Sequence, residues 1–326
     1  MRLRPDAERS MVGGVVLRFL PRTAVVAALA AAAATAPSGL ADRAAPVPHA
    51  KAPRACGRTP HRHPRIRHVI LIVMENKSRS AIIGRAPFIT ALAHRCGQAS
   101  NYFAITHPSL PNYLAMTSGS THGITDDCEP RQCPIRSHSI FGQLSRHHKK
   151  WRAYNESMIE PCQVAGTGLY APRHNPAVYY TRLRGRICNR HVVPLGGLES
   201  GRLTRALNRR HAPKYMFVTP NLCNDMHDCS VATGDRWLSQ WIPMMVRSRA
   251  YRRGHTAIFL TWDEGAHSGG NKVATVVVSP YTHVGTVAVH RFTHYSLLRT
   301  TEHLLGIRRY LGKAASARGL SKAFHL

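Results

Sequence analysis

The sequence predicts an α/β protein: a single doubly wound domain with a mainly parallel central sheet flanked by helices. Four short apolar segments have the composition of strands that are buried on both faces. These segments are His68–Met74, Lys214–Thr219, Thr256–Thr261 and Lys272–Ser279. Amphipathic stretches around 86–96, 198–210 and 234–247 separate or follow them and predict helices. Strands that alternate with helices are typical of one parallel sheet with crossover connections.

The composition adds an unusual charge to this ordinary core. The chain of 326 residues has 45 lysines and arginines against 16 acidic residues, a formal net charge of +29. Such a chain attracts anions, among them phosphorylated substrates, anionic lipid, cell-wall polymers and nucleic acid. Because acidic residues are so few, any place where they gather is informative.

The N-terminus has the features of an export signal. Arginines precede the apolar, alanine-rich segment Thr23–Ala36, and small residues follow it. The segment is short for a transmembrane helix, although an uncleaved anchor is the alternative. We therefore predict a signal peptide at 1–41, a linker rich in Pro, Arg and His at 42–66, a catalytic domain at 67–326, and a secreted or extracytoplasmic protein.

All eight cysteines follow the predicted signal, and an even number in an exported chain predicts disulfides. Closeness in sequence favours the pairs 128–133, 162–188 and 223–229, which leaves 56 with 96. A zinc–thiolate cluster is the alternative, but the chain has no CxxC motif.

The remaining elements are shorter. Helices are predicted at Ser137–Leu144 and Ser296–Leu305, a short strand at Lys150–Tyr154, and a loop at Gly166–Asn189. A helix is also expected after the stretch His107-Pro-Ser-Leu-Pro-Asn-Tyr, with Ser109 as its N-cap. Prolines on both sides of Ser109 fix the backbone there, which suits a rigidly held nucleophile.

Acidic and amide side chains follow three of the predicted strands. Glu75 and Asn76 follow the first, the loop after the second contains Asp225 and His227, and the adjacent pair Asp263–Glu264 follows the third. In an open α/β sheet these ends meet at one edge, where ligands bind. Neighbouring carboxylates repel each other unless a cation lies between them. The pattern therefore predicts a metal site of hard oxygen ligands.

This set of residues suits phosphate ester hydrolysis. A metal lowers the pKa of a hydroxyl and polarises phosphoryl oxygens, and Ser109 is the expected nucleophile, forming a phosphoserine. Arg173 and His174 can bind phosphate, and a histidine can protonate the leaving group. His294, at a predicted helix start, completes the set.

Six motifs in this order resemble the bacterial phosphoesterase family of acid phosphatases and phospholipases C, within the alkaline-phosphatase-like superfamily. They are Met74-Glu-Asn-Lys, His107-Pro-Ser-Leu-Pro-Asn-Tyr, Arg173-His-Asn-Pro, Thr219-Pro-Asn with Asn224-Asp-Met-His-Asp, Thr261-Trp-Asp-Glu and Thr293-His-Tyr. The similarity extends from about Arg67 to Leu305. In length and export signal the chain is most similar to the short secreted acid phosphatases.

The resemblance implies roles for individual residues and one divalent metal ion of unknown identity. Its expected ligands are Glu75, Asn76, Asp263, Glu264 and Asp225. The expected catalytic residues are Ser109, His227 and His294. Asn112, Arg173 and His174 are expected to bind substrate.

Three functions follow as alternatives. The first is an exported phosphomonoesterase acting on phosphorylated small molecules or lipids such as phosphoinositides. The second is a phosphodiesterase of the phospholipase C type. The third is a basic polyanion-binding protein with a vestigial site. An anionic membrane or cell-wall surface is an expected partner, whereas nucleic acid is not expected as a specific one.

Overall fold

The structure, a computed structural model, describes residues 55–57, 66–267 and 270–326. The predicted signal at 1–41 and most of the predicted linker at 42–66 lie outside these residues. No helix in the described part of the chain is long and apolar enough to span a membrane.

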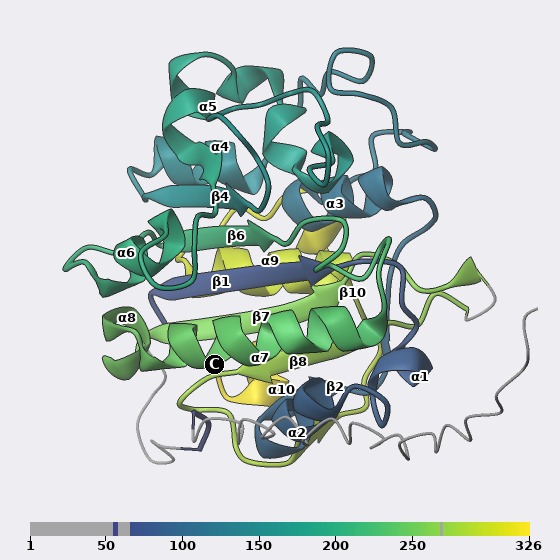
Figure 1. Cartoon of the computed structure of the whole chain (residues 1–326), viewed down its shortest axis with the longest axis vertical. Coiled ribbons are helices and arrows are strands. Elements are labelled where there is room, and N and C mark those ends of the chain that lie inside the picture. The colour runs from purple at the N-terminus through teal and green to yellow at the C-terminus, as the bar shows by residue number, and fades with distance from the viewer. Residues whose placement is uncertain (1–54, 58–65, 268–269) are drawn as a thin grey trace, which may run out of the picture. The chain divides into compact units, whose positions relative to one another are not determined.

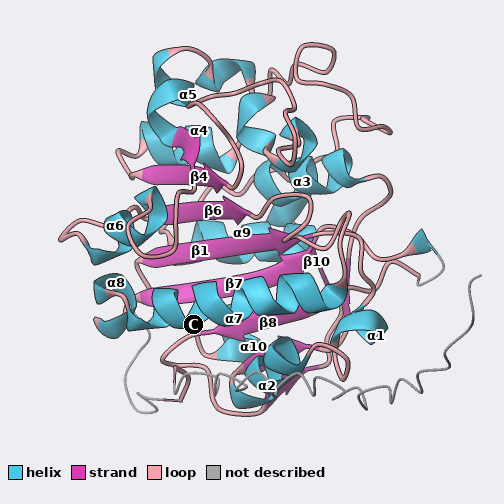
Figure 2. Ribbon diagram, viewed as in Figure 1, coloured by secondary structure: helices cyan, strands magenta, loops and turns pink. Residues whose placement is uncertain are grey.

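An eight-stranded sheet forms the core and confirms the predicted α/β class (Figure 2). All neighbouring strands are parallel except at β8, which runs antiparallel to both of its neighbours. In spatial order the strands are β5 (Val192–Pro194), β4 (Trp151–Asn155), β6 (Tyr215–Thr219), β1 (His68–Met74), β7 (Thr256–Trp262), β8 (Thr275–Val278), β2 (Gly97–Ala99) and β9 (Thr286–Ala288). A second sheet pairs β3 (Tyr102–Phe103) with β10 (Phe292–Thr293).

Helices lie on both faces of the sheet, with α7 in front and α9 behind in Figure 1. The helices are α1 (Arg79–Ile82), α2 (Pro87–Arg95), α3 (Ser109–Ser118), α4 (Ile140–Arg146), α5 (Arg186–His191), α6 (Arg202–Asn208), α7 (Val231–Arg247), α8 (Arg249–Arg252), α9 (His294–Leu304) and α10 (Ser321–Phe324). Short 3₁₀ helices are η1 (Pro172–His174), η2 (Pro176–Val178), η3 (Thr181–Leu183) and η5 (Gly312–Ala315). The predicted loop at Gly166–Asn189 therefore contains three of these 3₁₀ helices and the start of α5.

Local hydrogen bonds explain where the helices depart from prediction. Helix α7 begins earlier than expected because the Ser230 hydroxyl accepts a hydrogen bond from the Thr233 amide. Helix α6 is shorter than the predicted 198–210, since the Gly201 amide donates to the Gly197 carbonyl in a turn before it. Asp235 lies inside α7. Its carboxylate accepts from the amides of Phe88 and Ile89 at the start of α2.

All four predicted disulfides are present, and no described cysteine is free. The pairs are 56–96, 128–133, 162–188 and 223–229. Four disulfides match a protein that folds in an oxidising compartment. They also leave no thiolate for the alternative zinc cluster among the described residues.

One buried acid should make stability depend on pH. Glu302 on α9 is fully buried, and burial raises the pKa of its carboxyl to about 8. Between about pH 5 and pH 8 the unfolded chain releases a proton that the folded protein keeps, so stability falls as pH rises. Glu302→Gln keeps an acceptor for the Leu311 amide and should flatten this fall by roughly 2 kcal/mol. Denaturant unfolding of both proteins at pH 5 and pH 8 measures this difference. An equal fall of the unfolding free energy with pH in the two proteins would contradict the prediction.

Candidate active site

The carboxyl ends of β1, β6 and β7 bring the strand-end acids together at one edge of the sheet. The Asp263 amide donates to the carbonyl of Met74 at 2.9 Å, which places Asp263 beside Glu75. The Glu75 amide donates to the Asp225 carbonyl at 2.8 Å. Figure 1 shows α3 near these strand ends, with α6 and α8 near the opposite ends of the strands. The fold therefore concentrates buried acids beside the helix that begins with Ser109.

Ser109 points into this cluster. Its hydroxyl is buried and donates to Glu75 Oε2 at 3.1 Å. The expectation that Ser109 is an N-cap was wrong, because Pro108 occupies that position and Ser109 is the first residue of α3. The hydroxyl binds the carboxyl group of Glu75 instead of a backbone amide. The Leu110 amide at the helix start is bound by Asp127 Oδ1 at 2.8 Å.

His174 lies between two of the acids. Its Nε2 is 3.4 Å from Glu75 Oε2 and its Nδ1 is 3.3 Å from Asp225 Oδ2. Its ring stacks on Tyr113, with centroids 5.5 Å apart and planes 9° apart. Burial lowers the pKa of His174 to about 3, so the imidazole is neutral at any ordinary pH. A neutral buried imidazole can bind a cation or donate one hydrogen bond.

The acids of the cluster resist ionisation in the absence of a counter-charge. Burial raises the pKa of all four, to about 8 for Asp225 and about 9 for Glu264. For Glu75 and Glu264 the next cause is the charge of Asp263. A group of carboxylates in this position becomes ionised when a cation neutralises it.

The donor set fits a divalent cation. Three buried oxygens of this cluster have no hydrogen-bond donor among the described residues: Asn76 Oδ1, Asp225 Oδ2 and Asp263 Oδ2. Glu75, His174 and Asp225 each offer a ligand atom, and these atoms lie within 4.8 Å of one another. Carboxylate and amide oxygens with one imidazole suit several divalent metals. The structure thus adds His174 to the predicted ligand candidates.

Glu264 has different neighbours. Its Oε2 is 2.9 Å from His107 Nδ1 and accepts from Asn112 Nδ2 at 3.4 Å. The His107 ring also stacks on His267, with centroids 4.4 Å apart. His107 therefore joins the site through Glu264, although the sequence reasoning passed over it.

Four polar side chains form a partly exposed group at the edge of this cluster. Arg173 Nε is 3.6 Å from Asp127 Oδ2, and Arg173 Nη2 is 3.4 Å from His227 Nε2. His227 Nδ1 lies 2.5 Å from Asp228 Oδ1. A guanidinium beside an imidazole can bind a phosphate group. Asp127 was missed, but the tandem pair Asp126–Asp127 is the same signal that drew attention to Asp263–Glu264.

The side chains of Asn112 and His294 are fully buried and form hydrogen bonds with backbone groups near the site. Asn112 Oδ1 accepts from the amides of Ile105 and Thr106, and its Nδ2 donates to the carbonyls of Thr106 and Pro108. His294 Nε2 is 2.5 Å from the Asp263 carbonyl, and its Nδ1 is 3.1 Å from the Tyr102 hydroxyl. In this arrangement both side chains brace the segments that carry Ser109 and Asp263.

Tyr113 is a third site residue that was not predicted from the sequence. Its hydroxyl is buried one helical turn after Ser109 and donates to Glu75 Oε1. Glu75 is therefore held by two residues of α3, Tyr113 and Ser109. The spacing of four residues could have indicated it, since residues i and i+4 share one face of a helix.

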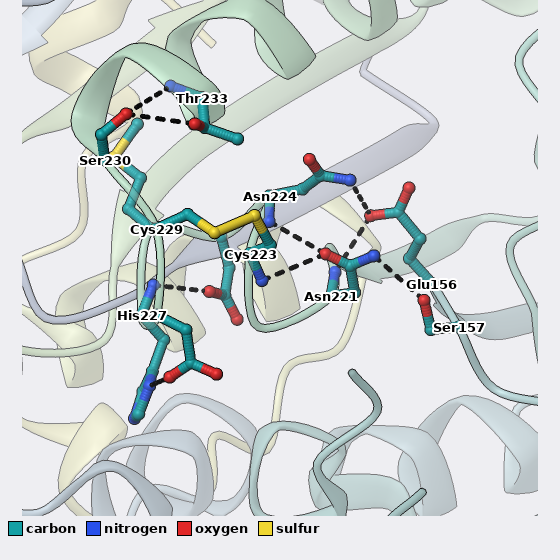
Figure 3. The surroundings of a disulfide bond; sticks show 12 residues. Glu156, Ser157, Asn221, Cys223, Asn224, His227, Cys229, Ser230 and Thr233 are labelled. Atoms are coloured by element: carbon teal, nitrogen blue, oxygen red, sulfur yellow. Dashed lines mark hydrogen bonds and ion pairs between the residues drawn. A yellow bond between two sulfur atoms is a disulfide. The ribbon is translucent and has the colours of Figure 1, made fainter. Parts of the chain in front are cut away.

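The loop after β6 is held at both ends by a disulfide, shown in Figure 3. Cys223 and Cys229 enclose Asp225 and His227. Asn221 Oδ1 accepts from the amides of Cys223 and Asn224, and Glu156 Oε2 accepts from Asn221 and Asn224 (Figure 3). The disulfide and the Asx turn together fix the direction of two site residues.

Removing this disulfide by Cys223→Ser with Cys229→Ser should cost about 2 kcal/mol of stability, because the closed loop is short. It should also lower kcat, since Asp225 and His227 lose their support. Replacing Cys162 and Cys188, which enclose a longer loop, should cost more stability but less activity. Thermal unfolding and phosphatase assays of both variants test this, and equal activity losses would contradict it.

Solved structures of low sequence identity share this fold. A member of the alkaline phosphatase superfamily from Vibrio parahaemolyticus superposes with a TM-score of 0.54 at 8% identity, covering 78% of this chain and 71% of that one. The lipoteichoic acid synthase LtaP from Listeria monocytogenes gives 0.53 at 10% identity, covering 78% and 73%. The fold is thus that of the alkaline phosphatase superfamily.

The chain belongs to the phosphoesterase family, whose model matches residues 84–308. It is 31% identical to the phosphatidylinositol-3-phosphatase of Mycobacterium tuberculosis, over 91% of this chain and 94% of that one. It is 30% identical to an acid phosphatase of Aspergillus fumigatus, over 64% of this chain but only 48% of the fungal protein. The protein is a phosphoric ester hydrolase, as the motifs predicted.

Proposed function

We propose that this protein is an exported, divalent-metal-dependent phosphomonoesterase of the acid phosphatase type, with its catalytic domain at 67–326. One observation carries the proposal: the Ser109 hydroxyl donates to Glu75 inside a buried cluster of carboxyl and amide oxygens that lack donors. A protein that only binds polyanions does not need four buried carboxylates.

Ser109 is the proposed nucleophile. Its Oγ forms a bond to phosphorus as the ester P–O bond breaks, giving a phosphoserine and an alcohol. Glu75 Oε2, already bonded to the hydroxyl, orients Oγ for the attack, and the hydroxyl proton passes to solvent. Water then attacks the phosphoserine, which returns Ser109 and releases inorganic phosphate.

The leaving oxygen needs a proton, and His227 is the proposed donor. It is half-exposed, its Nδ1 is held by Asp228, and it lies beside Arg173. His294 is less suited to proton transfer because it is fully buried and its Nε2 contacts the Asp263 carbonyl. We assign His294 and Asn112 as positioning residues, and Arg173 as the residue that binds the substrate phosphate.

Glu75, Asn76, Asp225, Asp263 and His174 are the proposed ligands of one divalent cation, with Glu264 beside them. When bound, the cation neutralises the carboxylates and polarises the phosphoryl oxygens. His174 can serve as a ligand because it is neutral.

A phosphoinositide is the proposed natural substrate class, supported by the name of the mycobacterial relative. The alternative is a phosphodiesterase of the phospholipase C type. A substrate panel on purified protein, after chelation and single-metal add-back, separates them. Release of inorganic phosphate from an aryl phosphate and a phosphoinositide supports the proposal. Phosphocholine released from phosphatidylcholine supports the alternative, and no turnover with any cation contradicts both.

Export and an anionic partner complete the proposal. Export is supported by the arginine-flanked apolar N-terminus and the four disulfides. The net charge of +29 supports an anionic partner. The kind of partner depends on where the positive charge gathers on the fold.

A further inference from the structure

Positive charge gathers around a cavity at the edge of the sheet where the parallel strands begin. We call this cavity of about 540 Å³ the amino-edge cleft. Eight of its fifteen lining residues are lysine or arginine, five are histidine, and none is acidic. They include Arg67, Lys149, Lys150, Arg209, Arg210 and Lys214.

The topology explains this concentration of charge. Arg67 precedes β1, Lys150 precedes β4 and Lys214 precedes β6. Because parallel strands start at the same edge, basic residues before several strands meet there. The seven residues of β1 separate this edge from the acidic cluster by roughly 20 Å. The amino-edge cleft is therefore distinct from the candidate active site.

The charge of the cleft is uncompensated. None of its lysines or arginines has a carboxylate oxygen within 4.0 Å among the described residues. Partial burial lowers the pKa of Lys214, and the charges of Arg67 and Lys149 lower it further. Like charges held this close repel each other, and an anion bound among them would relieve the repulsion.

A second basic cavity of about 480 Å³ continues the cleft. The two share Lys150, Arg209 and His211. The second adds four arginines and again contains no acid; these are Arg152, Arg190, Arg202 and Arg205. A continuous track of this kind fits a chain of charges better than a single compact anion.

The lining also argues against two kinds of anionic partner. Its one aromatic residue other than histidine is Tyr154, which is buried, so the track offers little for nucleic acid bases to stack on. The exposed large apolar side chains of the described residues lie outside both cavities, so insertion into lipid is unsupported. A membrane against this edge would also leave Ser109 at the opposite edge, facing away from the lipid.

We propose that the amino-edge cleft and its continuation bind a linear phosphate polyanion without bases, and so hold the enzyme on such a polymer while the active site stays open. This goes beyond the proposed hydrolysis and does not depend on it, because binding here needs neither Ser109 nor a metal.

Binding of long-chain inorganic polyphosphate to the full chain at several salt concentrations tests the proposal. The test variant combines Lys150→Gln, Arg209→Gln and Arg210→Gln. The matched control combines Arg85→Gln, Arg236→Gln and Arg308→Gln, three exposed arginines that line neither cavity. We expect the test variant to bind at least about tenfold more weakly at low salt. Its slope of log K against log salt should be smaller by roughly two.

Turnover of an aryl phosphate should be unchanged in both variants, which shows that they are folded. If the control variant bound polyphosphate as weakly as the test variant, the assignment of the binding site to the amino-edge cleft would be wrong. Tighter binding of single-stranded DNA, or binding of anionic vesicles without polyphosphate binding, would overturn the assigned ligand. Failure of catalysis with intact polyphosphate binding would count against the proposed function alone.

Discussion

Replacing Ser109 by alanine is expected to lower kcat on an aryl phosphate by at least about a thousandfold. The hydroxyl is buried and bonded to Glu75 inside the acidic cluster, and it is the proposed nucleophile. Its removal leaves only direct attack by water. Glu75 keeps its bond to Tyr113, so the variant should remain folded and should still bind metal.

Ser118 provides a matched control on the same helix. Its hydroxyl is also buried, but it donates to the Leu114 carbonyl and lies 2.7 Å from His122 Nε2. Ser118→Ala should cost about 1 kcal/mol of stability and keep activity within about twofold. Acid-quenched wild-type protein should carry phosphate on Ser109, detectable by mass spectrometry. Undiminished turnover by Ser109→Ala would remove it as the nucleophile.

The strands that could be predicted from the sequence are the buried ones, because burial requires a continuous run of apolar residues. β1, β6 and β7 are buried along nearly their whole length, so their apolar runs predict them closely. β2, β3, β9 and β10 have only two or three residues each. Runs this short have no detectable periodicity, and their pairing depends on distant partners. The antiparallel direction of β8 is set by such a partner too.

The site residues also differ in whether the sequence predicts them. The positions of Glu75, Asp225 and Asp263 follow from the rule that parallel strand ends share an edge. Tyr113, Asp127 and His107 could not be found in this way, because each acts through a neighbour supplied by another segment. Asn112 and His294 were predicted as site residues, but their positioning roles follow from their hydrogen bonds in the fold: Asn112 binds the backbone of residues 105–108, and His294 contacts the Asp263 carbonyl.

The second large effect concerns Asp263, which we expect to be essential for metal binding. Asp263→Asn should abolish high-affinity binding of the divalent cation, measured by calorimetry, and lower kcat at least about a hundredfold. The metal-free variant should nevertheless be about 1 kcal/mol more stable than the metal-free wild type. Burial raises the pKa of Asp263, and the charge of Asp263 raises the pKa values of Glu75 and Glu264, so the variant removes one source of repulsion.

Asp235→Asn separates this effect from a general loss of structure. Asp235 is also a buried aspartate, but its carboxylate caps α2 through the amides of Phe88 and Ile89. Its variant should lose roughly 1 kcal/mol of stability and bind the cation as before. A saturating cation should stabilise wild type and Asp235→Asn alike, by about 2.7 kcal/mol at one hundred times Kd, but not Asp263→Asn. If it stabilised all three equally, the cation would bind elsewhere, and the buried carboxylates would need another counter-charge.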